Sequence, residues 1–417
     1  MKRAIFFLVA ACALHAETWP EMKHDCTNDK KTFFVKLFGC VADAFQLDGP
    51  HAIVHSFPPP GSIGFGLGYS KPFSANSWER SFTSGAAVSI RGFWYVESRL
   101  TVMHIGKPTG RQTDEKTGFH LYGNVQDLSR LPFYGLGPHS SLSNLTNFHE
   151  RIATVGGDLQ QPLNNYFTAG AAVEGLIPDI SPTHSAIASI ETKFSELTAP
   201  GLADQPVVVH YNGFLRFHGK VPDLWQNFED RVSYGYYQDT SSGHYSFRRF
   251  RADVNHTFFP FPGPRHHRED RSFSIRGILS LSDTATGNAV PFYLQETLGG
   301  TGIDGIATLR AFDDYRFRAP YLAVIQTEYV HRLWSKPRPP GTGAGPLGDG
   351  LLHTLGLFAF YDVGQVALRR GDLDIGNMRH SVGGGIAIFV GGFLQAKIFV
   401  GLGGGEGHHT YTVIPKI

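Results

Sequence analysis

The segment Leu298–Trp334, LGGTGIDGIATLRAFDDYRFRAPYLAVIQTEYVHRLW, joins a glycine-rich run and a charged loop to an alternating strand. Arg310 lies in the loop, Glu328 lies in the strand, and a second alternating run, Leu352–Val366, contains Asp362. Successive side chains of a strand face opposite sides, and both acids fall on the face opposite the one suited to lipid. A guanidinium stays charged when buried, and its forked donors match carboxylates. We therefore predict that Arg310 forms a buried ionic clasp with one or both acids.

The composition favours a protein that crosses a membrane with strands. The chain has 49 glycines, 13% aromatic residues and only 18% charged residues. No segment offers the ~18 uninterrupted apolar residues that a membrane helix needs. Closed barrels instead cross with alternating strands and carry aromatic girdles at both interfaces. The net charge of +1 gives no reason to expect nucleic acid as a partner.

From Ser62 to the end, alternating runs are separated by short polar or Pro/Gly-rich stretches, without a helical period or a tandem repeat. On the apolar face of Tyr321–Trp334, Tyr321 and Tyr329 lie roughly 20 Å apart along the membrane normal, close to the ~25 Å apolar band of such barrels. Apolar and polar side chains would also alternate along the strands of a soluble β-sandwich, but the polar face of its sheets would contact bulk water. We therefore predict an all-β fold, a transmembrane antiparallel β-barrel of about 16 strands over residues 62–417.

In residues 1–16 a basic region, an apolar run and a small residue follow one another in the order found in export signal peptides. Lys2 and Arg3 precede the apolar run Ile5–Ala11, and Ala16 offers a small residue for cleavage. A buried N-terminal strand is the alternative. Val9-Ala10-Ala11-Cys12 resembles a lipobox, which would place a lipid on Cys12, but the short apolar run before Cys12 favours simple cleavage.

Residues 17–61 are predicted to form a separate N-terminal segment. Within Lys30–Phe45 apolar residues recur at helical spacing, which predicts a short amphipathic helix that packs on the barrel or lies on the membrane surface. Phe57–Gly61 is rich in proline and is predicted to be a linker. Cys26 and Cys40 are expected either to form a local disulfide or to remain two buried thiols.

Three more stretches accompany the clasp residues, and the ordered set resembles the bacterial surface-antigen superfamily. They are Leu131–Pro138 (LPFYGLGP), Val290–Tyr293 (VPFY) in a strand leading into an inward loop, and Ser381–Gly385 (SVGGG) in the penultimate strand. Members of this superfamily are outer-membrane assembly-factor barrels and two-partner secretion transporters. The resemblance implies a bacterial outer-membrane location and a long extracellular loop folded into the barrel, so that Arg310, with Phe312 beside it, meets inward carboxylates.

The resemblance also implies a physical rather than an enzymatic function. Such a barrel would aid insertion or translocation of polypeptide, or of lipid, through a weak seam between its first and last strands. The expected partners are outer-membrane lipid and either client polypeptides or periplasmic proteins, around a monomeric barrel without a cofactor. A passive pore or a structural surface barrel is the alternative. We predict that Ser62–Tyr69 pairs with His409–Ile414 through fewer hydrogen bonds than join Tyr321–Trp334 to Leu352–Val366.

Three features depart from the superfamily pattern. Between the predicted signal peptide and the predicted barrel there is no room for periplasmic polypeptide-binding repeats, so a client-loading role is not expected. The loop motif usually reads Arg-Gly-Phe or Arg-Gly-Tyr, whereas this chain has Ala311, which would cost about 1 kcal/mol or more at positive φ. The sequence ends Thr412–Ile417 rather than in the terminal aromatic residue that usually guides insertion.

Other motifs are not expected to carry chemistry. Gly300–Gly305 matches GxGxxG, but a charged loop and a strand follow it instead of a helix, so a dinucleotide site is not expected. The pairs His266–His267 and His408–His409 would point to opposite faces of a strand, which is poor metal-ligand geometry. The chain has no GxSxG elbow. Lipid hydrolysis by a serine and a histidine on the outer face, as in outer-membrane phospholipases, is the enzymatic alternative.

Overall fold

The computed structural model describes residues 49–75, 78–104, 117–221, 226–259, 271–302, 304–333, 355–390, 393–403 and 406–413. Several predictions fall on residues 1–48 and therefore lie outside the described residues. These are the signal peptide, a lipid on Cys12, the pairing of Cys26 with Cys40 and the helix within Lys30–Phe45. The same holds for His266 and His267.

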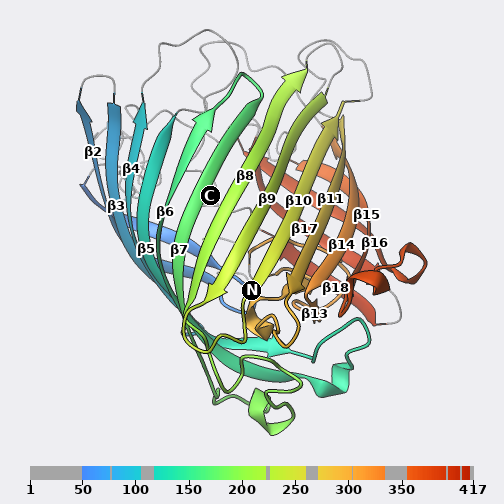
Figure 1. Ribbon diagram of the computed structural model, residues 1–417. Helices are drawn as coiled ribbons and strands as arrows, with labels where there is room; N and C mark the ends of the chain where they lie inside the picture. The colour runs from blue at the N-terminus through green and yellow to red at the C-terminus, as the bar shows by residue number, and fades with distance from the viewer. Residues whose placement is uncertain are drawn as a thin grey trace.

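Sixteen strands form one antiparallel sheet in the order β1 to β11 and then β14 to β18, curved into a barrel (Figure 1). The strands are β1 (Gly49–Phe57), β2 (Ser62–Ala75), β3 (Trp78–Ser89), β4 (Trp94–His104), β5 (Gly118–Phe133), β6 (Thr146–Pro162), β7 (Phe167–Ser181), β8 (Val208–Val221), β9 (Gln226–Asp239), β10 (Phe247–Phe258), β11 (Arg271–Thr284), β14 (Tyr321–Arg332), β15 (Leu355–Ala367), β16 (Arg379–Val390), β17 (Phe393–Gly403) and β18 (Gly407–Val413). The predicted all-β barrel is confirmed.

The connections between the strands contain little regular structure. A small sheet pairs β12 (Glu296–Leu298) with β13 (Phe317–Ala319). Single turns of 3-10 helix occur at Leu142–Asn144, Ile190–Thr192, Phe292–Leu294, Arg370–Asp372 and Ile375–Asn377. In the part of the chain that the structure describes, no helix is long and apolar enough to span a membrane.

Alternation along the strands gives the barrel an apolar outer face. On β14, Ile325 is 48% exposed, whereas Leu322 and Val324 are each 2% exposed and pack inside. Other strands expose leucine and valine in the same way, as at Leu67, Val155, Leu215 and Leu402. An apolar band of this kind suits contact with lipid chains.

The segment between β11 and β14, residues 285–320, folds back into the barrel (Figure 1). Its Leu309, Phe312 and Phe317 are fully buried and belong to one cluster with Ile278 and Val366 of the barrel wall. Near one end of the barrel, the same segment joins the β5–β6 and β7–β8 connections in a second cluster, whose members include Phe133, Phe148, Ile190, Phe292 and Tyr293. These two hydrophobic cores therefore lie between the wall and its loops.

The predicted start of the barrel at Ser62 is wrong, because an additional strand precedes it. β1 pairs with β2 from Gly49↔Ser70 to Phe57↔Ser62. The proline-rich stretch is therefore not a linker: it turns the chain between two strands, with the N–H of Gly61 donating to the carbonyl of Pro58 (2.8 Å). Phe57 is 4% exposed and packs edge-to-face on Phe93. Burial of this aromatic ring helps fix β1 in the sheet.

The prediction that Val290–Tyr293 lies in a strand is also wrong. β11 ends at Thr284, and Phe292–Leu294 forms a 3-10 turn. Pro291 has no N–H to give to a β-ladder, which disfavours a paired strand at this point. Phe292 and Tyr293 are instead buried in the core cluster at the end of the barrel.

Candidate functional site

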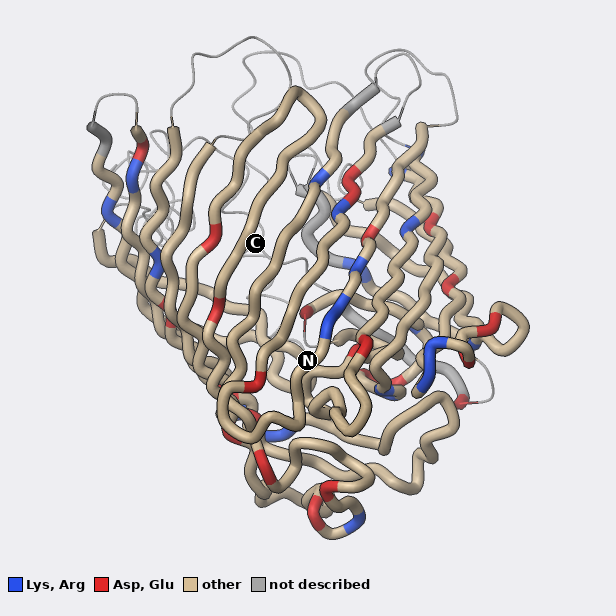
Figure 2. Tube along the Cα trace, viewed as in Figure 1, with Lys and Arg blue, Asp and Glu red and all other residues tan. Residues whose placement is uncertain are grey.

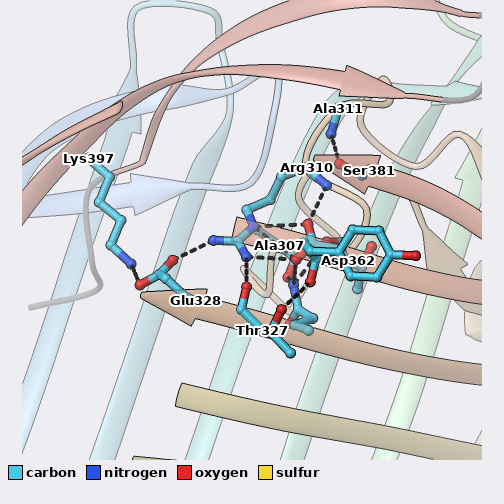
Figure 3. Close-up of polar contacts among 11 residues, drawn as sticks. Ala307, Arg310, Ala311, Thr327, Glu328, Asp362, Ser381 and Lys397 are labelled. Carbon is cyan, nitrogen blue, oxygen red and sulfur yellow. Dashed lines mark hydrogen bonds and ion pairs between the residues drawn. The ribbon is translucent and has the colours of Figure 1, made fainter. Parts of the chain in front are cut away.

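The clasp that the sequence predicts is present as a contact inside the barrel (Figure 3). Arg310 lies in a tight turn in which the N–H of Phe312 donates to the carbonyl of Leu309 (3.1 Å). The Arg310 side chain donates from Nε to Oδ2 of Asp362 (2.9 Å) and from Nη2 to Oδ1 (2.6 Å). Its backbone N–H also donates to Oδ2 (3.1 Å). Asp362 is completely buried, so this bidentate pairing supplies its counter-charge.

The remaining donors of Arg310 face β14. Nη1 donates to Glu328, which also accepts from Lys397 on β17 (Figure 3). The guanidinium lies 3.9 Å from the ring centroid of Phe360, a cation–π contact. Burial alone would lower the pKa of Arg310, but the Asp362 and Glu328 carboxylates outweigh it and raise that pKa above its usual value. The arginine therefore stays charged.

A row of neighbouring side chains fixes the loop backbone around Arg310. Asp362 lies directly opposite Gln326 on β14 and Ser381 on β16. Gln326 donates to the carbonyls of Ala307 (3.0 Å) and Thr308 (2.9 Å). The Oγ of Ser381 accepts from the N–H of Ala311 (2.8 Å) (Figure 3). Three adjacent strands thus contribute one polar row that holds the turn.

Ala311 fits the turn without backbone strain. In the described ranges, the non-glycine residues with positive φ are Ser62 and Tyr315, so Ala311 is not in the left-handed region. The motif usually has glycine at this position. The methyl group of Ala311 therefore does not incur the conformational cost that a non-glycine residue pays at positive φ.

The loop rests directly on β17. An added Cβ at Gly401 would lie 3.0 Å from the Cβ of Ala311, and one at Gly403 would lie 2.8 Å from the ring of Phe312. Phe312 is fully buried and packs edge-to-face on Phe317. The two glycines therefore provide the space that this part of the loop occupies.

A second anchor, which sequence reasoning missed, joins β12 to the wall at β10 and β11. Glu296 accepts from Arg251 (2.7 Å) and from the hydroxyl of Ser280 (2.8 Å), and it lies 3.4 Å from Arg249. The glutamate is 7% exposed, so its charge depends on these donors. Arg251 also bridges to Asp304 (3.3 Å).

A third anchor, also missed, holds the far side of the loop. Arg316 donates from Nε to both carboxylate oxygens of Glu406 (2.9 and 3.0 Å). It also donates to the hydroxyl (2.9 Å) and carbonyl (2.7 Å) oxygens of Ser140 in the β5–β6 connection. Glu406 lies between β17 and β18, so this anchor joins the inward loop to the last hairpin.

The missed residues share one cause. Lys397, Glu296 and Glu406 are isolated charges in the sequence. Only the strand register brings Lys397 to Glu328 and brings the two glutamates to Arg251 and Arg316. An available signal was the excess of arginine in Arg310–Arg318, because three arginines in nine residues of a buried loop each need an acceptor.

Solved structures share this architecture. BamA from Haemophilus ducreyi lacking POTRA domains 1–3 is 9% identical, with 96% of this chain and 81% of that chain covered and a TM-score of 0.54. CdiB from Escherichia coli is 11% identical, with 87% of this chain and 61% of that chain covered and a TM-score of 0.51. This chain has the fold of these barrels. At such low identity the likeness establishes the fold alone, which agrees with the sequence resemblance.

Comparison at the level of sequence finds no match. No family model fits this chain, and no curated protein is similar to it.

Proposed function

We propose that this chain is an outer-membrane barrel that aids insertion or translocation of polypeptide, or of lipid, at the seam between β1 and β18. The observation that carries this proposal is the state of the two end strands. In the residues described, ladders join β1 to β2 and β17 to β18, but none joins β1 to β18. By contrast, the β14–β15 ladder contains twelve residue pairs.

An unpaired strand edge has a direct physical use. Its free N–H and C=O groups can hydrogen-bond to an added strand, as in β-augmentation. A client segment that enters the seam would satisfy its backbone groups before it meets the apolar membrane interior. The lipid-facing surface and the clasped loop support this proposal, because they stabilise the rest of the barrel while β1 and β18 stay unpaired.

The proposed activity needs no chemical step and no cofactor. Its partners would be outer-membrane lipid and a client chain, and the barrel would act as a monomer. The alternative is a passive pore or a structural barrel. A polar cavity of about 820 Å³ against β8–β11 favours the pore, because it leaves room for water inside the wall.

Locking the seam tests the proposal. In a background with the native cysteines replaced by serine, cysteine at His51, Ile53 or His55 of β1 is paired in turn with cysteine at Thr410 or Thr412 of β18. The purified protein in liposomes is then assayed for insertion of a model outer-membrane barrel protein, by protease protection, before and after reduction of the disulfide.

The control disulfide joins Val400→Cys to Thr410→Cys, which lie opposite each other in the β17–β18 ladder. It constrains the same last strand but leaves the seam open. We expect the oxidised seam pairs to lose insertion and to regain it on reduction, while the control pair keeps it. Equal insertion by all oxidised pairs would support the pore or structural alternative.

A further inference from the structure

The core at the end of the barrel, where the inward loop meets the β5–β6 and β7–β8 connections, contains charged side chains as well as aromatic rings. Figure 2 shows acidic and basic residues at this end of the barrel. Two of the charged side chains in the core, Glu150 on β6 and Arg318 on β13, are each only 2% exposed. A buried charge is stable only where its hydrogen-bonding atoms find partners.

Four side-chain atoms of this core are buried without a hydrogen-bond partner among the described residues. They are Oε2 of Glu150, Nε of Arg318 and the hydroxyl oxygens of Tyr293 and Tyr315. The two tyrosines belong to the core cluster and are 4% and 1% exposed. Glu150 interacts electrostatically with each of the other three side chains. These four residues therefore form one polar cluster inside an otherwise apolar core.

Arg318 enters the polar cluster from the inward loop, and only part of its guanidinium is satisfied. Its Nη1 donates to the carbonyl of Phe292 (2.8 Å). Its guanidinium lies 5.7 to 5.9 Å from the centroids of three aromatic rings, those of Phe133, Phe148 and Phe292. Within the described ranges Arg318 makes no direct ion pair with Glu150, in contrast to the two charges of the clasp. Opposite charges in a dry core would close to direct contact, because their attraction is strong at low dielectric. Their separation indicates that a polar group lies between them.

We infer that the polar cluster binds ordered water, which joins the inward loop to the wall as a fourth anchor. Water both donates and accepts, so one molecule can bond to a carboxylate oxygen, a guanidinium N–H and a hydroxyl, and a buried water typically makes about three such bonds. The surrounding aromatic rings leave no path to the cluster for a larger polar ligand. Glu150 comes from β6 and the other three residues come from the loop, so the water connects the loop to the wall. This site goes beyond the proposed function, because it does not depend on the seam.

Removal of one tyrosine hydroxyl tests the site through the sign of its effect on stability. If the hydroxyl of Tyr315 bonds to water, Tyr315→Phe breaks that bond and destabilises the protein. If the core is dry, the same change removes an unsatisfied polar group from an apolar environment, and stability stays unchanged or rises. The two cases therefore differ in direction and not only in size.

The experiment is chemical unfolding of the full chain in detergent micelles, and the midpoint of unfolding is measured for Tyr293→Phe and Tyr315→Phe. Tyr245→Phe provides the scale of one lost hydrogen bond, because the hydroxyl of Tyr245 donates directly to Glu196. Tyr234→Phe is the control on β9, because the side chain of Tyr234 is 55% exposed.

We expect Tyr293→Phe and Tyr315→Phe to lower the midpoint about as much as Tyr245→Phe does, and Tyr234→Phe to leave it unchanged. A crystal structure of the wild type should show water at hydrogen-bonding distance from both charged groups of the polar cluster. An unchanged or raised midpoint in both Tyr293→Phe and Tyr315→Phe would overturn the inference. A crystal structure in which the two charged groups of the cluster contact each other directly would overturn it as well.

Discussion

Arg310 shows how a single buried charge can depend on its partners. Its guanidinium holds the completely buried Asp362 and the partly buried Glu328. In Arg310→Ala, Asp362 would keep a buried charge without a counter-ion, which typically costs about 3–5 kcal/mol. We expect a loss of stability of this order in detergent, measured by chemical unfolding. Arg130→Ala on the surface should change it by less than about 0.5 kcal/mol; a similar loss in both variants would contradict the clasp.

Gly403 tests the fit between the loop and the wall. A methyl group there would lie 2.8 Å from the ring of Phe312 and 2.9 Å from the Cβ of Ala311. Gly403→Ala should therefore cost about 1–3 kcal/mol through overpacking and should expose the loop to protease. Gly277 is the matched control on β11, since an added Cβ there would meet nothing within 4 Å. Equal protease sensitivity of Gly403→Ala and Gly277→Ala would argue against close packing on β17.

At the scale of elements, the inward loop is joined to the last hairpin by Arg316 and Glu406. Glu406→Gln keeps the size of the side chain but removes its charge, at a cost of about 1–3 kcal/mol. We expect faster hydrogen exchange in residues 304–320 and in β17–β18, with β3–β4 unchanged. Asp283→Asn is the control, because its contacts with Arg370 (3.9 Å) and with the hydroxyl of Tyr321 (2.9 Å) are both exposed. Faster exchange confined to residue 406 and its neighbours would show that the hairpin and the loop move independently.

Some strands and contacts could be predicted from the sequence, and others could not. β14 and β15 were predictable because side-chain alternation is local, and the same alternation placed Glu328 and Asp362 inside. β1 was missed because Pro58–Pro60 follows it and suggested a linker, and because apolar and polar residues do not alternate clearly in His51–Phe57. The anchors at Glu296 and Glu406 depend on register between distant segments, and no local pattern gives that register.

At the scale of the whole molecule, the proposed function implies two separate routes through the barrel. Ions would pass along the lumen, which the loop of residues 285–320 obstructs and the β8–β11 cavity leaves partly open. A client would instead pass through the seam between β1 and β18. Since the loop is held by ion pairs at Glu296, at Arg310 and at Arg316, loosening these anchors should widen the ion route without closing the seam.

We therefore expect a small conductance for the wild-type barrel in planar bilayers. The double variant Arg310→Ala/Glu296→Gln should raise it several-fold, because both the clasp and the β12 anchor are lost. A seam disulfide should leave conductance unchanged, because the path of ions along the lumen does not cross the seam. If the seam disulfide lowered conductance as strongly as it lowered insertion, ions and clients would share one route. If the double variant conducted like wild type, the loop would not be the obstruction, and the narrowest point of the lumen would lie elsewhere.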